Sequence, residues 1–326
     1  MPLILDRRSL LGLLGSASLW PQAALAAPYP TPDREAMVPV EGGRVYVRLN
    51  GAAKKGRPPI LLVHGGPGSG HSSYMPFLRL ADERPVILYD QLDAGRSDAP
   101  NDPRNWRIKR FVDEIDAIRR AFKLEQFHLY GGSWGGTIAL EYAGRRPAGL
   151  ASVTLQNPLV STRRWIADAQ TLRATLPSDV QDVMRRCELP SPPPAESCAS
   201  ADAVFNDRFL LRSPRPPELE AYRKSLPISF NQRIYEAMWG RTEFVATGTL
   251  RNYNGEHLLA RLDGSRTLFV TGQYDEARPE TVADFARRVA GAEFAVIPGA
   301  SHSIAIDRPD ELLALVALWL RRHDRI

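Results

Sequence analysis

The stretch FHLYGGSWGGTIALEY, residues 127–142, places the pattern Gly-x-Ser-x-Gly directly after an apolar run and before a helix-forming segment. A serine in a tight turn between a strand and a helix is held at the helix N-terminus with its hydroxyl exposed, an arrangement called a nucleophile elbow. The flanking Gly131 and Gly135 let the strand and the helix approach each other closely. The pattern therefore predicts Ser133 as the nucleophile of a covalent reaction.

The order of strand and helix repeats on both sides of this elbow. Further apolar runs without alternation lie at residues 60–63, 86–89, 268–270 and 294–297. Such runs are typical of strands that are buried on both faces of a parallel sheet. Apolar residues recur at helical spacing over residues 108–122 and again over 311–320, and a hairpin with a glycine turn is expected over residues 37–49. The predicted fold class is α/β, with a mostly parallel sheet flanked by helices.

The middle of the chain departs from this alternation. Residues 161–247 contain many prolines, both cysteines and several aromatic residues, but no convincing parallel strand. Segments such as Arg164–Leu176 and Glu218–Ser225 look helical. We therefore expect a helical cap at residues 161–247, inserted between two parts of a hydrolase core at residues 27–160 and 248–326.

His302 is the predicted general base. A serine hydroxyl is a weak nucleophile that needs an adjacent base, and after a nucleophile elbow the chain order is nucleophile, acid and then histidine. His302 follows the apolar run at residues 294–297, so we expect it at the same edge of the sheet as Ser133. Activity is expected to fall as its imidazole becomes protonated, near or below about pH 6.5 for an unperturbed histidine.

Asp275 is the predicted acid of the triad. It comes after the apolar run at residues 268–270, and its role is to hold the imidazole tautomer and to stabilise the imidazolium. Asp263 precedes that run and Asp284 is expected on a helix, so both are less suitable alternatives. The side chain of the adjacent Glu276 is expected to point elsewhere.

Two backbone N–H groups are predicted to stabilise the oxyanion that forms during acyl transfer. One belongs to Trp134, the residue after the nucleophile, and the other comes from the loop that follows an earlier strand. That loop is HGGPG at residues 64–68, in which glycines let the N–H groups face a substrate carbonyl, and we favour Gly66 as the donor.

The composition argues against several other classes of protein. The chain has 326 residues, of which 44% are hydrophobic and 24% charged, as in globular proteins. Its net charge of +5 is scattered among acidic residues, without the basic and aromatic clustering that nucleic-acid binding requires. No internal apolar stretch is long enough to span a bilayer. No metal-ligand cluster and no phosphate-binding glycine loop is apparent, so neither a metal nor a cofactor is expected.

The first 26 residues have the pattern of a secretory signal peptide. Arg7–Arg8 precede the apolar run Leu10–Leu19, and residues 24–26 provide an Ala-x-Ala cleavage site. The paired arginines resemble a twin-arginine signal, and an uncleaved membrane anchor is the alternative. We therefore expect a periplasmic or secreted protein. In such an oxidising compartment Cys187 and Cys198 form either a disulfide or two free thiols.

Four blocks of the sequence resemble the proline iminopeptidase branch of the α/β hydrolases. They are HGGPG at residues 64–68, DQLDAGRS at 90–97, GGSWGGT at 131–137, and GQYDEARP at 272–279 together with Ser301–His302. The resemblance covers residues 38–320 and is weaker in the cap. It implies an α/β-hydrolase core with a helical cap, and an enzyme that removes N-terminal residues, often proline, from short peptides. Ser133, Asp275 and His302 fall on the catalytic positions of the family.

The same resemblance suggests how the substrate is recognised. An aminopeptidase must bind a free ammonium group, which calls for carboxylates near the cap. The block MWGRTEF, residues 238–244, resembles the cap segment of the family, and Glu243 matches its amine-binding glutamate. A second carboxylate is expected but not located by the sequence, with Glu218 and Asp207 as candidates.

Two further features concern substrate preference. Trp239, Phe244 and Trp134 are candidates for an apolar wall around a proline ring. Asp93 stands where the family usually carries glycine in the DQ-x-G-x-GRS block, which puts the substrate preference in doubt more than the chemistry.

Two other functions remain open on the sequence alone. An amino-acid amidase or an esterase would use the same triad, because all these reactions transfer an acyl group through one intermediate. A non-catalytic binding protein on the same fold is a third hypothesis, although the intact set of catalytic residues argues against it.

Overall fold

The computed structural model describes residues 29–189 and 191–324. The predicted signal peptide, residues 1–26, lies outside the described part of the chain. The described residues begin with a short segment without regular secondary structure that leads into the first strand.

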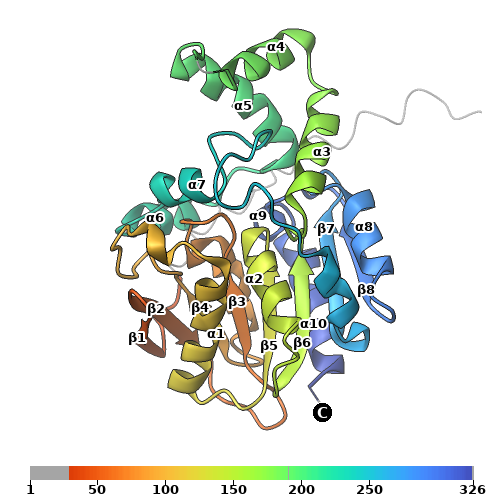
Figure 1. Ribbon diagram of the computed structural model, residues 1–326. Helices are drawn as coiled ribbons and strands as arrows, with labels where there is room; N and C mark the ends of the chain where they lie inside the picture. The colour runs from red at the N-terminus through yellow and green to blue at the C-terminus, as the bar shows by residue number, and fades with distance from the viewer. Residues whose placement is uncertain (1–28, 190, 325–326) are drawn as a thin grey trace, which may run out of the picture.

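A single mixed sheet forms the centre of the molecule (Figure 1). The strands are β1 (Arg34–Val40), β2 (Gly43–Asn50), β3 (Ile60–Val63), β4 (Val86–Tyr89), β5 (Phe127–Gly132), β6 (Leu150–Gln156), β7 (Thr267–Gly272) and β8 (Glu293–Ile297). Their order across the sheet is β1-β2-β4-β3-β5-β6-β7-β8. β2 is antiparallel to β1 and β4, and the remaining neighbours are parallel. The predicted α/β class with a mostly parallel sheet is therefore confirmed.

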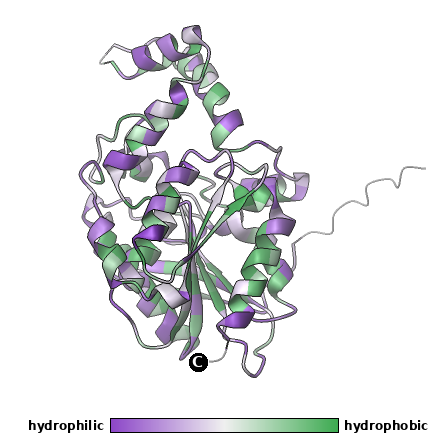
Figure 2. Ribbon diagram, turned by 90° about the vertical axis from the view of Figure 1, so that its right-hand side faces the viewer, coloured by the Kyte–Doolittle hydropathy of each residue, from purple (hydrophilic) through white to green (hydrophobic). Residues whose placement is uncertain are grey.

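Helices cover both faces of the sheet because alternate side chains of each buried strand point to opposite sides. Leu61 and Val63 belong to one apolar core, and Ile60 and Leu62 to the other. The first core is closed by α1 (Ile108–Phe122), α2 (Trp134–Ala143) and α8 (Pro279–Arg287). The second is closed by the 3₁₀ helix η1 (His71–Leu80), α9 (Ile304–Asp307) and α10 (Pro309–Arg322). Figure 2 shows the apolar strands enclosed between these helices.

The chain leaves this core between β6 and β7 to form the cap (Figure 1). The cap helices are α3 (Thr162–Arg173), α4 (Ser178–Cys187), α5 (Ala195–Phe209), α6 (Pro217–Ser225) and α7 (Gln232–Met238). The outer part of the cap has its own apolar cluster, in which Phe205 contacts Phe209 and Phe244. Three short 3₁₀ helices complete the described elements: η2 (Pro103–Asn105), η3 (Glu256–Arg261) and η4 (Gly264–Arg266).

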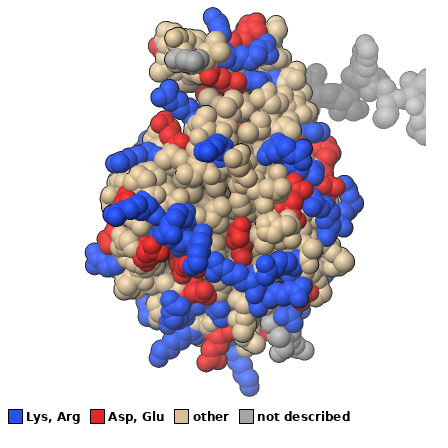
Figure 3. Space-filling model, in the orientation of Figure 1, with Lys and Arg blue, Asp and Glu red and all other residues tan. Residues whose placement is uncertain are grey.

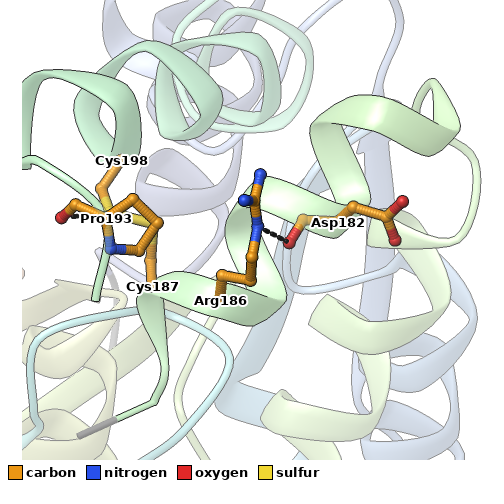
Figure 4. The surroundings of a disulfide bond; sticks show 5 residues. All are labelled: Asp182, Arg186, Cys187, Pro193 and Cys198. Carbon is orange, nitrogen blue, oxygen red and sulfur yellow. Dashed lines mark hydrogen bonds between the residues drawn. A yellow bond between two sulfur atoms is a disulfide. The ribbon is translucent and has the colours of Figure 1, made fainter. Parts of the chain in front are cut away.

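A disulfide between Cys187 and Cys198 joins the end of α4 to the start of α5 (Figure 4). The bond closes a short loop that contains the proline-rich segment between the two helices. Of the two states that the sequence left open for these cysteines, the structure has the bonded one. Cross-linking of this kind typically stabilises a fold by about 2–4 kcal/mol, because it restricts the unfolded chain.

Two strands differ from what the sequence pattern suggests. β6 was not singled out by its apolar pattern, because Ser152 and Thr154 interrupt the apolar residues, yet both are buried at 1% exposure. β8 lies at the edge of the sheet, so that Phe294 and Val296 are 37% and 38% exposed. In both strands the burial of these side chains depends on the position of the strand in the sheet, which local sequence does not encode.

The outer surface carries charges of both signs. Figure 3 shows basic and acidic side chains interspersed over the face in view, on the core and on the cap. Many of them are paired, as in the contacts Arg44–Asp98 and Arg164–Asp284. Among residues 29–189 and 191–324, no helix has the length and apolar character needed to cross a membrane.

Candidate active site

Ser133 occupies the sharp turn between β5 and α2. Its backbone has φ 55° and ψ −124°, a conformation that is strained for any residue other than glycine. The turn is possible because neighbouring positions lack side chains: a Cβ on Gly135 would lie 2.0 Å from the carbonyl oxygen of Val63, and one on Gly131 would lie 2.2 Å from that of Gly135. The sequence thus creates the predicted elbow by removing every Cβ that would block it.

His302 and Asp275 lie together at the same edge of the sheet as Ser133. The Nδ1 atom of His302 is 2.7 Å from Oδ1 of Asp275, which leaves Nε2 free to act as a base. Asp275 is 1% exposed, and its carboxylate also accepts hydrogen bonds from the backbone N–H groups of Ala277 and Gly272. His302 and Ser133 line one cavity. Within the described chain, no hydrogen bond joins these two side chains.

The two alternative acids lie in other environments. Asp263 caps η4 by accepting from the backbone of Ser265. Asp284, on α8, forms an ion pair of 2.6 Å with Arg164. Neither residue lines the cavity that contains Ser133.

Asn157 connects the residues of the predicted triad, and the sequence analysis missed it. Its Nδ2 donates to Oδ2 of Asp275 at 2.8 Å and to the carbonyl oxygen of His302 at 2.9 Å, and its Oδ1 accepts from the N–H of Ser133 at 3.2 Å. The side chain is fully buried, so these bonds have no competition from solvent. Asn157 directly follows β6. Its place after a buried strand is the only local feature of the sequence that indicates a position at this edge of the sheet.

The two predicted oxyanion donors face the same cavity. Gly66 and Trp134 both line it, and among the described residues neither N–H group has a hydrogen-bond acceptor. Gly66 has φ 42°, in the left-handed region that favours glycine. The side chain of Trp134 is fixed by a 2.8 Å hydrogen bond from its Nε1 to Gln91, which in turn donates to the backbone of His64 in the HGGPG loop. These two hydrogen bonds fix the nucleophile turn and the HGGPG loop relative to each other.

A cavity of about 410 Å³ lies above these residues, between the sheet and the cap. Its apolar wall is formed by Leu159, Trp165, Tyr235, Trp239 and Leu250, with Trp134 at its base. The candidate role of Phe244 in this wall is wrong: Phe244 is absent from the lining and packs against Phe205, 4.9 Å between ring centroids, in the core of the cap.

Glu243 extends from the cap into the cavity, as the sequence predicts. Its Oε2 accepts a hydrogen bond of 3.3 Å from Nε1 of Trp165, and its Oε1 accepts one from the hydroxyl of Tyr235. Burial raises the pKa of this carboxyl group, although these hydrogen bonds and the nearby imidazole of His302 oppose the effect. A cation that binds next to a buried carboxylate stabilises its charged form.

Glu276 provides a second carboxylate in the cavity, where the sequence analysis expected its side chain to point elsewhere. It is 3% exposed, and its Oε1 lies 3.5 Å from Nε2 of His302. Its Oε2 has no hydrogen-bond partner among the described residues. The earlier candidates for this position, Glu218 and Asp207, do not line the cavity.

The three carboxylates determine the charge state of the imidazole. Burial lowers the pKa of His302, but the carboxylates of Asp275, Glu276 and Glu243 together outweigh burial and raise it to about 9. The expectation of an unperturbed imidazole is therefore wrong. Burial likewise raises the pKa of Glu276 well above its usual range, reinforced by the neighbouring acids and opposed by His302. The part of the cavity next to His302 is therefore acidic, with the carboxylates of Asp275, Glu276 and Glu243 close to one imidazole.

Comparison with known proteins assigns the chain to a family. A family model described as alpha/beta hydrolase fold matches residues 58–309. A proline iminopeptidase of Heyndrickxia coagulans is 37% identical over 290 residues, which cover 88% of this chain and 98% of the relative. A proline iminopeptidase of Levilactobacillus brevis is 32% identical over 298 residues, 90% of this chain and 98% of the relative. The chain belongs to the proline iminopeptidase family of α/β hydrolases.

Solved structures agree with this membership. The crystal structure of a proline iminopeptidase from Mycobacterium smegmatis superimposes with a TM-score of 0.81 at 32% sequence identity, covering 89% of this chain and 99% of that one. The similarity therefore includes the cap as well as the core. Both the predicted family and the predicted α/β-hydrolase fold are confirmed.

One departure from the family pattern, Asp93, serves the structure of a loop and lies outside the cavity lining. Its side chain accepts hydrogen bonds from the N–H of Asn101 at 2.7 Å and from Nε1 of Trp106 at 2.8 Å. Its backbone has φ 67°, in the left-handed region that glycine adopts most readily. The Asp93 side chain does not line the cavity, and its backbone carbonyl accepts from Asn231, whose N–H donates to Gly68 of the HGGPG loop, so an effect on substrate preference would be indirect.

Groups of three or more His, Cys, Asp or Glu side chains that could hold a metal ion were not found in the described residues.

Proposed function

We propose that this family member is a serine exopeptidase that releases N-terminal proline from short peptides. The observation that carries the proposal is the pair of buried carboxylates, Glu243 and Glu276, in the same cavity as Ser133 and His302. These two acids, with no Lys or Arg ion pair of their own among the described residues, fit the ammonium group of a peptide N-terminus. The aromatic and aliphatic wall beside them suits the proline ring.

The geometry supports acyl transfer in two stages. Ser133 Oγ attacks the carbonyl carbon of the N-terminal residue while His302 Nε2 accepts the hydroxyl proton, and Asp275 stabilises the imidazolium. The N–H groups of Gly66 and Trp134 hold the negative oxygen of the tetrahedral intermediate. Collapse breaks the peptide C–N bond as His302 returns the proton to the leaving amine. Water then attacks the acyl-enzyme with His302 again as base, which releases the free amino acid and restores Ser133.

The substrate itself prepares the base for this reaction. In the empty site the carboxylates raise the pKa of His302 to about 9, so the imidazole is protonated near neutral pH and does not accept a proton. An ammonium group between Glu243 and Glu276 compensates their charge and lowers the pKa of His302. Binding of the correct substrate thereby favours the neutral imidazole that the first step requires.

The decisive test compares proline p-nitroanilide with its N-acetylated form and with p-nitrophenyl acetate. We expect kcat/KM for the free amine to exceed that for the acetylated amide by about 30-fold to several thousand-fold, because losing one partner of a buried charge pair costs about 2–5 kcal/mol. Equal or faster cleavage of the acetylated amide would contradict the proposal and identify a general amidase. Preference for the ester alone would identify an esterase.

We further propose that the chain is exported, with residues 1–26 acting as the signal. The charged, apolar and small-residue regions support this location, and the Cys187–Cys198 disulfide suits an oxidising compartment. We expect the protein recovered from the periplasm or medium to have an intact mass that begins at Ala27 with no alkylatable thiol. Full-length protein confined to the cytoplasm would disprove the assignment.

A further inference from the structure

The cavity has a basic side that the proposed reaction does not yet use. Arg215, in the loop before α6, and Arg223, on α6, both line it together with Ser133. Arg223 is paired with Glu220, at 3.0 and 2.9 Å. Arg215 forms no ion pair and no hydrogen bond through its side chain with residues 29–189 or 191–324.

Helix α6, which carries Arg223, and Glu276 lie on opposite sides of the nucleophile. Ser133 follows β5, which lies in the middle of the sheet. Glu276 follows β7, two strands away in one direction, whereas α6 packs on η1 at the side of β3 and β4, in the other direction. In the view of Figure 1, α6 lies above the β4 side of the sheet, and α3, which supports Glu243 through Trp165, lies above the β7 side.

Helix α6 is anchored to the core, so its arginine is held in a defined place. The hydroxyl of Tyr222 is 2.7 Å from Nε2 of His71, and Nδ1 of that histidine is 2.8 Å from Oδ1 of Asp90, at the end of β4. Leu219, 2% exposed, packs in the apolar core below. A guanidinium group fixed in this way loses little conformational freedom on binding an anion.

This arrangement matches the charges of a dipeptide. When the ammonium group lies at the glutamates and the first carbonyl at Ser133, the second residue must extend toward α6. Two residues span about 7 Å when extended, and strands on either side of β5 are spaced at about 4.8 Å. The carboxylate of a dipeptide thus lies one residue beyond the bond that Ser133 attacks, whereas the end of a longer peptide lies farther from Ser133.

We propose that Arg215 and Arg223 bind the α-carboxylate of the residue after the scissile bond, so that dipeptides with N-terminal proline are the preferred substrates. The inference rests on the proposed aminopeptidase function and specifies its substrate class. Guanidinium groups bind carboxylates through charge-assisted, often bidentate hydrogen bonds. Arg215 has a free guanidinium for this contact, and Arg223, whose Nε and Nη2 donate to Glu220, can offer its Nη1 as a further donor.

The test measures kcat/KM for Pro-Ala and for Pro-Ala amide, which differ only in the terminal carboxylate. We expect wild type to prefer Pro-Ala by about tenfold to a hundredfold, the range for hydrogen bonds to charged groups. In Arg215→Gln this ratio should fall toward one, mainly through a higher KM for Pro-Ala. A third substrate, Pro-Glu amide, separates recognition of the α-carboxylate from recognition of an acidic side chain.

The matched control is Arg186→Gln. Arg186 is an exposed cap arginine on α4 whose Nε donates to the backbone of Asp182 (Figure 4). This substitution removes the same charge from the cap. An equal decrease in the ratio of kcat/KM for Pro-Ala to that for its amide would assign the effect to long-range attraction and overturn the proposal.

The remaining outcomes are also decisive. A wild type that cleaves Pro-Ala and its amide equally, or that prefers the amide, overturns the proposal without any variant. A preference for Pro-Glu amide over Pro-Ala would show that the basic side recognises a side chain instead. If wild type cleaves no substrate with a free proline amine, the proposed function itself fails. If both Arg215→Gln and Arg223→Gln keep the wild-type preference for Pro-Ala over Pro-Ala amide, the arginines do not bind the carboxylate.

Discussion

Ser133→Ala is expected to remove essentially all hydrolysis of proline p-nitroanilide, with kcat lower by a factor on the order of 10⁵ to 10⁶. The hydroxyl is the only group in the proposed mechanism that forms a covalent bond with the substrate, and alanine leaves no oxygen in its place. The oxyanion donors and both glutamates remain, so KM should change much less than kcat. Steady-state rates with rigorously purified protein measure this loss.

Ser133→Gly is the matched control, because it removes the same hydroxyl and also relieves the backbone. Glycine adopts φ 55° without the strain that serine or alanine has there, which is worth about 1–3 kcal/mol, while its greater freedom in the unfolded chain costs about 0.5–1 kcal/mol. We expect the glycine variant to be equally inactive but about 1 kcal/mol more stable to denaturant than the alanine variant. Substantial turnover in either variant would exclude Ser133 as the nucleophile.

Glu276→Gln should have the second-largest effect, lowering kcat/KM for proline p-nitroanilide by about 30-fold to several thousand-fold. Glutamine preserves the shape of the side chain but removes the charge that we assign to the substrate ammonium. Activity on the N-acetylated substrate, which has no ammonium, should be affected far less. Glu280→Gln, on the exposed start of α8, makes the same chemical change outside the cavity and should leave both activities as in wild type.

The pH profile of the same variant tests the electrostatic part of the argument. A base works only when neutral, so activity is lost as the pH falls through the pKa of His302, which three carboxylates raise to about 9 in the free enzyme. Removing the charge of Glu276 removes one of those raising effects. The acid limb of kcat/KM should therefore move to lower pH in Glu276→Gln, and an unchanged limb would show that Glu276 does not act on His302.

The sequence by itself determined the chemistry of the elbow and the class of the fold. Glycines at 131 and 135 around Ser133 have a local meaning, because a tight turn excludes every Cβ from those positions whatever the rest of the protein does. Apolar runs predict buried parallel strands, and chain order then places His302 and Asp275 after the correct strands. These are properties of short segments or of their order, and both can be read along the chain.

Only the tertiary structure decided which other side chains meet at the site. Asn157 follows a strand whose buried Ser152 and Thr154 hide its pattern. The direction of the Glu276 side chain depends on the turn after β7. Phe244, a candidate for the cavity wall, packs in the core of the cap, and local sequence does not distinguish these two places for an aromatic residue. The convergence of Glu243, Glu276, Arg215 and Arg223 joins segments far apart in the sequence. The packing of the cap on the sheet brings them together, and no local pattern encodes that packing.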